Sequence, residues 1–522
     1  MNLDLQNITP LENESPACFA GRLGELYTST VSSQLKKENG QFFTPLGIAR
    51  FMSKQIADNQ SSVSILDPGC GTAILSCALI EKLSQSGKLK EVRLVTYEID
   101  LVLCPVTKII IEYLKEWLYK QNIFFSYVIH NSDFVLDNYL YLNNHLYQAE
   151  EQTTKFDFII SNPPYFKLSK EDKRVKAAQC IIDGQPNIYS IFMAICSRLL
   201  KPSGELIFIV PRSFTSGRYF RLFRSYFFDK VKIEFIHLFN TRKDTFSKDN
   251  VLQETLIIKC TNKEVNATTG DNPVIISYSE GIKDLDFASK KKFAQKDLID
   301  LNSIEKILHL PVNIREEAII KLFKSWSGSL NKYNIQISTG PVVAFRTKEN
   351  ISENKEDNIA PLFWLHNVVK MLIDHPVIKE GKGQYIRISK DTISSLIPNK
   401  NYIFLRRFSS KDDSSRLIAA PYFCNMSSAT YIGVENKLNY IYRPKGHLDR
   451  TEVMGIAALL NSNLFDTYFR TFNGNVNVSA TELREMPMPP LETIKAIGEQ
   501  LILMNNFSLD NVSVIVNKFF HV

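Results

Sequence analysis

Cysteine is scarce in this sequence, and long apolar runs are missing. Only 8 of the 522 residues are cysteine, and none of them forms a CxxC pair, which argues against a zinc or redox site. No stretch approaches the roughly 18 consecutive apolar residues that predict a transmembrane helix, and the first residues lack the pattern of a signal peptide. We therefore expect a cytoplasmic protein in a reducing compartment, without a metal and without a membrane partner.

A strong excess of charge is also missing. Lys and Arg number 62 against 55 Asp and Glu, which gives a net charge of +7. This mild value permits a polyanionic partner, but only local clusters of basic residues would mark its surface. The length of 522 residues and the 44% of apolar residues predict several folding units with sizeable cores.

Residues 61–260 alternate short β-rich runs with longer helical stretches. This alternation is typical of a doubly wound, mostly parallel α/β sheet of the Rossmann-like kind. Apolar runs bounded by turn residues predict strands at Val63–Leu66, Val92–Tyr97, Phe124–Ile129, Phe156–Ile160, Glu205–Val210, Lys232–Leu238 and Val251–Lys259. Helical spacing predicts helices at Leu101–Lys120 and Asn187–Leu200, and the turn residues Lys201–Gly204 are expected to end the second helix.

A polar, turn-rich segment from Thr261 to Gly270 interrupts this pattern. We therefore predict two domains, residues 1–262 and residues 263–522. The second mixes short strands, basic loops and aromatic residues without a repeat, which indicates a mixed α+β domain.

Three predicted strand tips carry residues that suit an adenosine. The first strand runs into Asp67-Pro-Gly-Cys-Gly-Thr-Ala73, whose small residues let a ligand approach the backbone. The second ends at Glu98, which can accept hydrogen bonds from both ribose hydroxyls. The third ends at Asp133 and Phe134, an acceptor for an exocyclic amine and an apolar edge for a purine. The GxGxxG and GxxxxGK[ST] motifs of pyrophosphate binding are absent, so an adenosine without a pyrophosphate remains.

The fourth strand leads directly into Ser161-Asn-Pro-Pro-Tyr165. Prolines fix the backbone, so the Asn162 side-chain oxygen and the Pro163 carbonyl oxygen can face one amino group. Hydrogen bonds to both N–H groups of an aromatic amine favour a tetrahedral nitrogen, whose lone pair can attack a methyl sulfonium in line. Tyr165 offers a ring for a base to stack on. A rigid surface turn is the alternative interpretation, but its position after a buried strand argues against it.

With these motifs in this order, the sequence resembles the gamma-class N6-adenine DNA methyltransferases of restriction-modification systems. The resemblance implies S-adenosylmethionine as the methyl donor, and Gly40-Gln-Phe-Phe-Thr-Pro45 matches the segment that closes the cofactor pocket in that family. Ala73 differs from the family, which more often has Gly there. The implied cofactor-binding residues are Thr44, Pro45, Asp67, Gly69, Gly71, Glu98, Asp133 and Phe134, and the implied catalytic residues are Asn162, Pro163, Tyr165 and Phe246, the last sandwiching the flipped base opposite the tyrosine.

The same resemblance assigns recognition of the DNA target to residues 263–522. Basic residues cluster between Asn401 and Arg450, and the candidates for phosphate or base contacts are Arg406, Arg407, Lys411 and Arg416. Each of the four also suits a solvated surface charge. The implied function is that of a monomeric, site-specific enzyme that flips an adenine out of double-stranded DNA and methylates it, protecting the DNA from a cognate restriction endonuclease.

Several alternatives stay open at this stage. Enzymes that methylate cytosine N4, guanine N2 of ribosomal RNA or a protein glutamine act on a similar planar amine. The cytosine enzymes more often have Ser at the position of Asn162, which favours adenine. A non-catalytic DNA-binding subunit of a defence system is an alternative of another class, and the acceptors Asn162, Glu98 and Asp133 argue against it.

Overall fold

The computed structural model describes residues 8–31, 40, 42–57, 59–142, 155–239, 254–263, 273–409, 413–474 and 477–521. The chain divides into two compact units, Met1–Val312 and Asn313–Val522. In these described ranges, no helix is long and apolar enough to cross a membrane.

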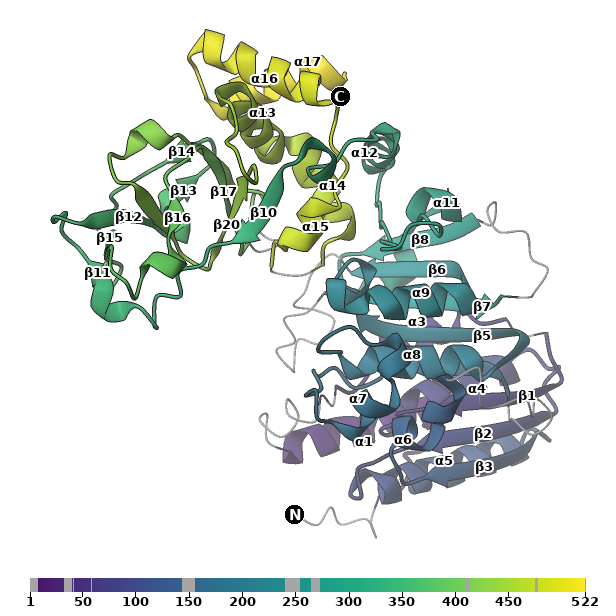
Figure 1. Ribbon diagram of the computed structural model, residues 1–522. Helices are drawn as coiled ribbons and strands as arrows, with labels where there is room; N and C mark the ends of the chain where they lie inside the picture. Colours follow the sequence, from purple (N-terminus) through teal and green to yellow (C-terminus); the bar gives the residue numbers. More distant parts are fainter. Residues whose placement is uncertain are drawn as a thin grey trace. The chain divides into compact units, whose positions relative to one another are not determined.

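The first unit is built on a nine-stranded sheet with helices on both faces (Figure 1). Its strand order is β3-β2-β1-β4-β5-β7-β6-β8-β9. The strands from β3 to β5 pair in parallel, whereas β7 is antiparallel to both of its neighbours and β9 is antiparallel to β8. The strands are β1 (Ser62–Asp67), β2 (Glu91–Tyr97), β3 (Phe124–His130), β4 (Phe156–Ser161), β5 (Leu200–Pro211), β6 (Val231–Phe239), β7 (Thr255–Asn262), β8 (Pro273–Ser279) and β9 (Ser289–Ala294). The predicted doubly wound, mostly parallel Rossmann-like sheet is confirmed.

Two hydrophobic cores lie on the two faces of this sheet. Helices α1, α3, α4 and α5 cover one face, and α6, α7, α8 and α9 cover the other (Figure 1). Helix α5 shows why they pack this way, because Leu103, Val106, Ile110 and Leu114 recur at helical spacing and are all buried. The helices are α1 (Pro16–Thr30), α3 (Leu46–Ser53), α4 (Ile74–Ser84), α5 (Leu103–Tyr119), α6 (Phe134–Asn138), α7 (Lys173–Ala177), α8 (Ile188–Arg198), α9 (Arg221–Lys230) and α11 (Gln295–Leu298).

The first compact unit extends beyond the boundary predicted at residue 262. Strand β8 lies parallel to β6, and β9 pairs with β8, so both strands after the polar segment belong to the same sheet. The structural boundary therefore falls after Val312. The polar composition that suggested a domain linker marks the connection between two strands of one sheet.

The turn predicted at residues 201–204 is also different in the structure. Helix α8 ends at Arg198, as the turn signal implies, but residues 200–211 form one strand, β5. The register between β4 and β5 shifts between Phe156 and Phe158, opposite the turn-forming residues. Ser203 adopts a φ of +59° there. The proline and glycine thus mark an irregularity within a strand.

The second unit has the mixed α+β character that its sequence predicts. Its four-stranded sheet has the order β10-β20-β17-β18, its five-stranded sheet the order β11-β15-β12-β19-β16, and β13 pairs with β14. The strands are β10 (Gln336–Thr339), β11 (Ile351–Ser352), β12 (Ile359–Phe363), β13 (Val368–Val369), β14 (Leu372–Ile373), β15 (Tyr385–Arg387), β16 (Ile397–Pro398), β17 (Tyr402–Arg406), β18 (Ala419–Tyr422), β19 (Tyr431–Val434) and β20 (Leu438–Tyr442). The helices are α12 (Ile314–Ser325), α13 (Arg450–Asn461), α14 (Asn463–Phe472), α15 (Ala480–Arg484), α16 (Leu491–Met504) and α17 (Leu509–Phe520).

Candidate active site

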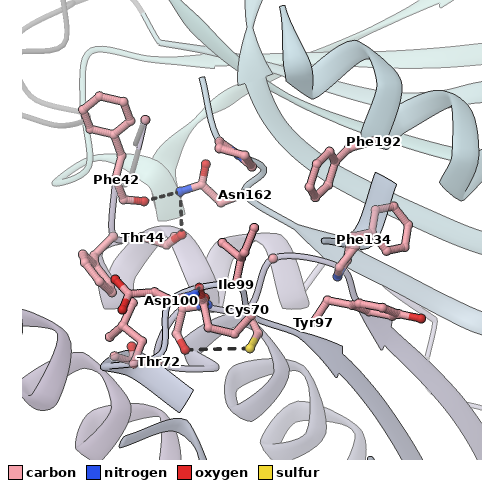
Figure 2. Close-up of a pocket in the computed structure, with 18 of the residues that line it drawn as sticks. Phe42, Thr44, Cys70, Thr72, Tyr97, Ile99, Asp100, Phe134, Asn162 and Phe192 are labelled. Atoms are coloured by element: carbon pink, nitrogen blue, oxygen red, sulfur yellow. Dashed lines mark hydrogen bonds between the residues drawn. The ribbon is translucent and has the colours of Figure 1, made fainter. Parts of the chain in front are cut away.

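Strands β1 and β4 lie side by side at the centre of the first unit, and the chain continues from them towards opposite edges of the sheet. The loops that follow two such strands diverge and leave a crevice at the carboxyl edge, where open α/β sheets bind ligands. A cavity of about 1000 Å³ lies at this position (Figure 2). The predicted residues that line it are Thr44, Gly69, Gly71, Glu98, Asp133, Phe134 and Asn162.

Acidic residues after β2 form one side of the cavity. Glu98 is 8% exposed, and its two carboxylate oxygens accept the backbone N–H groups of Gly71, at 2.9 Å, and of Asp100, at 2.8 Å. Burial raises the pKa of Glu98. The Tyr27 hydroxyl of α1 donates to Asp100 Oδ2 at 2.7 Å and also lines the cavity. These carboxylates are held at a fixed place beside the glycine loop.

The end of the neighbouring strand β3 supplies a further part of the cavity wall. Asp133 caps α6, and its Oδ1 accepts the backbone N–H groups of Val135 and Leu136 at 2.9 and 3.0 Å. The other oxygen, Oδ2, lies 3.6 Å from a guanidinium nitrogen of Arg174. Phe134 packs against Tyr97 and Phe192, with ring centroids 5.1 and 5.0 Å apart, and Figure 2 shows the three rings together. A carboxylate beside an apolar corner suits the edge of a purine ring.

Asn162 joins the catalytic loop to the segment before α3. Its amide nitrogen Nδ2 donates to the Phe42 carbonyl oxygen at 2.8 Å and to Thr44 Oγ1 at 3.0 Å (Figure 2). Its Oδ1 accepts a hydrogen bond from the Tyr165 hydroxyl. Because an amide oxygen has two lone pairs, Oδ1 can accept a further hydrogen bond. The amide is therefore oriented by three contacts at the wall of the cavity.

The other predicted catalytic residues are placed differently. Tyr165 is 7% exposed, its hydroxyl oxygen also lies 2.7 Å from the Ile209 carbonyl oxygen, which shares the single O–H with Asn162, and its ring stacks on Phe42 with centroids 5.8 Å apart. The ring is thus covered rather than presented as an open surface for a base. Pro163 follows Asn162 in the same loop, whose next residue, Pro164, lines the cavity. The predicted Phe246 lies outside the described residues.

Two predicted cofactor ligands, Pro45 and Asp67, make contacts with neighbouring helices. Pro45 is the N-cap of α3, and its carbonyl oxygen accepts the N–H of Ala49 at 3.0 Å. Asp67 is fully buried, and its Oδ2 accepts the Ser76 hydroxyl at 2.7 Å. Burial raises the pKa of Asp67 to about 7. The contact with Ser76 holds the glycine loop against α4, and the contact of Asp67 with the cofactor stays a prediction.

This buried carboxyl predicts a dependence of stability on pH. Because the folded pKa lies near 7 and above the ordinary value, the folded state retains a proton that the unfolded state releases, so stability is lost as pH rises towards 7. Urea unfolding should show the stability of wild type relative to Asp67→Asn falling by up to about 2–3 kcal/mol between pH 5 and pH 8. A constant difference for Asp67→Asn would contradict the shift.

Ala73, which departs from the resembling family, lies at a strained position. Its φ is +55°, in the left-handed region, at the start of α4. Such a conformation costs an alanine about 1 kcal/mol more than a glycine. The more common Gly at this place in the family therefore has a backbone explanation, and the loop keeps its turn despite the alanine.

The predicted DNA contacts of the second unit differ in their exposure. Arg406 and Arg407 are partly exposed, and they donate to the carbonyl oxygens of Val368 at 2.7 Å and Asn436 at 3.0 Å. Arg416 is 1% exposed and donates to Ser409 Oγ at 3.0 Å and Asn473 Oδ1 at 2.9 Å. Arg416 therefore belongs to the interior of this unit, which corrects its prediction as a DNA contact. Lys411 lies outside the described residues.

Several residues that line the cavity carried no clear sequence signal. Tyr27, Phe192 and Arg174 lie on helices α1, α8 and α7 and reach the cavity only through the tertiary fold. Phe42 belongs to the segment that the resemblance identifies, but within that segment the resemblance implies cofactor contacts for Thr44 and Pro45. A tyrosine or phenylalanine at helical spacing is more often a core residue, so pattern alone does not single these residues out.

The central parallel sheet, with a cavity at its switch point bounded by two acidic strand tips, defines a Rossmann-like α/β fold with a ligand-binding crevice at the carboxyl edge of the sheet. Residues 78–246 match the family of Eco57I restriction-modification methylases. The type II methyltransferase M.BsuBI of Bacillus subtilis is 32% identical over 473 residues, which are 90% of this chain and 91% of that protein. The type II methyltransferase M.PstI of Providencia stuartii is 29% identical, with 95% of each chain covered. The chain belongs to the type II restriction-modification methyltransferases.

Among solved structures, the DrdV–DNA complex is similar to this chain with a TM-score of 0.49 and 15% identity, covering 94% of this chain and 59% of that one.

Proposed function

We propose that this protein transfers the methyl group of S-adenosylmethionine to the N6 amine of adenine in double-stranded DNA, at a specific site. One observation carries the proposal: the Asn162 amide lines the same cavity as Glu98 and Asp133. An acceptor for a target amine therefore lies beside a pocket that suits an adenosine. Asn162, rather than the serine more common in cytosine enzymes, supports adenine as the target.

The residues of the cavity suit S-adenosylmethionine chemically, because carboxylates and aromatic rings line it together. Glu98 would accept the ribose hydroxyls, and Asp133 Oδ2 would accept the adenine amine, because Oδ1 already accepts two backbone N–H groups. Phe134, Tyr97 and Phe192 provide the apolar contact for the purine. The bound donor would supply an electrophilic methyl group on a positively charged sulfur. Transfer removes that charge, so the site needs alignment more than a strong base.

Asn162 is the residue that would act on the target amine. Its Oδ1, together with the Pro163 carbonyl oxygen, would accept the two N–H groups of the flipped adenine and favour the tetrahedral nitrogen. The contacts of Nδ2 with Phe42 and Thr44 fix the direction in which Oδ1 points. This orientation is established before the base arrives, which lowers the reorganisation needed in the transition state.

The second unit is proposed to recognise the DNA target. Arg406 and Arg407 are its partly exposed candidates among the predicted contacts, and contacts to phosphates would give salt-dependent affinity. We infer that the enzyme acts as a monomer in the cytoplasm and protects DNA from a cognate restriction endonuclease. The enzyme would rotate the adenine out of the duplex, because a paired amine is not accessible to the donor.

Transfer of a tritiated methyl group tests the proposal. Wild-type protein is incubated with labelled S-adenosylmethionine and, separately, with unmethylated plasmid, ribosomal RNA and a protein extract. We expect label in the plasmid as N6-methyladenine, identified by mass spectrometry of nucleosides. Label in N4-methylcytosine, in RNA or in protein would support the corresponding alternative, and absence of transfer to all of them would favour a non-catalytic DNA-binding subunit.

A further inference from the structure

Arg174 connects parts of the first unit that are distant in sequence. It lies on α7, and its guanidinium makes two hydrogen bonds to the Asp172 carboxylate, at 2.9 and 2.6 Å. A third nitrogen, Nη1, lies 3.6 Å from Asp133 Oδ2. The same group lies over the Phe166 ring, 5.4 Å from its centroid. One side chain thus contacts the segment after β4 and the acidic tip of β3.

The segment that Arg174 holds is continuous with the catalytic loop. Phe166 directly follows Tyr165, and both residues lie next to Gly40. The Tyr165 N–H donates to the Gly40 carbonyl oxygen at 3.4 Å. A Cβ atom built on Gly40 would lie 2.8 Å from the Phe166 ring. Phe166 and Arg174 also both line the cavity. Arg174 is therefore connected through Phe166 to the residues that follow Asn162.

Arg174 is also placed to control the free oxygen of Asp133. Oδ1 is committed to the backbone of α6, so a ligand amine has only Oδ2 to bind. The distance of 3.6 Å to Arg174 is that of an ion pair without a direct hydrogen bond, so the lone pairs of Oδ2 stay available to a ligand. The side chains of Arg174 and Asp133 are 21% and 17% exposed, and partial burial makes the attraction stronger than that of a surface pair.

We propose that Arg174 is a positioning residue that couples occupancy of the cofactor pocket to the conformation of the loop that holds the target base. By attracting Asp133 Oδ2 it keeps the acceptor for the adenine amine in place, and through Phe166 and Asp172 it holds the loop after Asn162 in the observed conformation. The inference rests on the proposed binding of S-adenosylmethionine. By linkage, the effect is reciprocal: DNA bound at the loop tightens the cofactor, and the cofactor tightens the DNA.

A double-mutant cycle on the full chain tests the contact. The affinity for S-adenosylhomocysteine is measured by titration calorimetry for wild type, Arg174→Ala, Asp133→Asn and the double variant. Arg174→Ala should weaken binding about tenfold, because the substitution removes both a partly buried ion pair and a cation–π contact. In the Asp133→Asn background the same change should have a much smaller effect. Arg174→Lys keeps the charge without the paired bonds to Asp172 and should recover part of the affinity.

The coupling is measured separately with duplex DNA that carries 2-aminopurine at the target adenine. Saturating S-adenosylhomocysteine should raise the affinity of wild type for this DNA, and this enhancement should shrink in Arg174→Ala. Lys176→Ala removes an equal charge from the same helix, where Lys176 is exposed and paired with Glu171, and should bind the cofactor like wild type. Additive effects in the cycle, or an unchanged enhancement in Arg174→Ala, would contradict the proposed role of Arg174 and would leave the proposed function untouched. Absence of cofactor binding to wild type would instead remove the proposed function itself.

Discussion

Replacing Asn162 with alanine should lower the rate constant for methyl transfer by about 10²–10³-fold, the usual effect of removing one preorganised polar group from a transition state. The loss arises because Oδ1 no longer accepts an N–H of the target amine, so the nitrogen lone pair stays delocalised into the ring. Affinity for S-adenosylmethionine should fall much less, since Glu98 and Asp133 still line the cavity. Single-turnover transfer at saturating donor and DNA separates the chemical step from binding.

Two further variants make this result specific. Asn262→Ala is a matched control, because Asn262 Nδ2, like Asn162 Nδ2, donates two hydrogen bonds, in this case to the backbone carbonyl oxygens of Leu200 and Lys201 at 3.1 and 3.0 Å. These hydrogen bonds lie at the start of β5, the edge of the sheet opposite the cavity, so transfer should stay near the wild-type rate. Asn162→Asp keeps an acceptor at the same place and should retain more activity than Asn162→Ala. Equal rates for Asn162→Ala and Asn262→Ala would exclude a role of Asn162 in the chemistry.

The sequence predicts those residues of the site that directly follow a strand. Glu98, Asp133 and Asn162 each follow an apolar run, and parallel strands bring their carboxyl ends to one edge whatever the details of packing. Pattern reasoning needed only the order and direction of these strands. It failed at residues 201–204 and at residue 262, because proline, glycine and polar residues mark an irregular strand or a strand connection as readily as a turn or a linker.

The sequence predicts the burial of a side chain less well than its position at the end of a strand. Asp67 and Arg416 have side chains that are usually exposed, yet both are buried and hydrogen-bonded in their respective units. Arg174 meets Asp133 only because α7 folds back over α6. Such pairings are properties of the tertiary structure, and a single sequence holds no local signal for them.

Substituting valine for Gly71 should weaken S-adenosylmethionine binding by about one to two orders of magnitude, as strain of a few kcal/mol at one residue implies. Gly71 has a φ of +53°, which a β-branched residue adopts only at high energy. An added Cβ would also lie 3.3 Å from the Phe43 ring. The loop would have to move, and the hydrogen bond from the Gly71 N–H to Glu98 Oε2 at 2.9 Å would move with it. The carboxylate that is placed for the ribose would then lose its support.

Gly87→Val separates this local effect from a general loss of stability. Gly87 has a similar φ of +68°, and a Cβ there would have no heavy atom within 4 Å. It is exposed in the turn after α4, outside the cavity. Both variants should therefore unfold at lower urea concentration than wild type, but only Gly71→Val should lose cofactor affinity in calorimetry at a temperature where both remain folded. Equal losses of affinity in the two variants would mean that backbone strain alone, and not the contact of Gly71 with Glu98 and Phe43, explains the result.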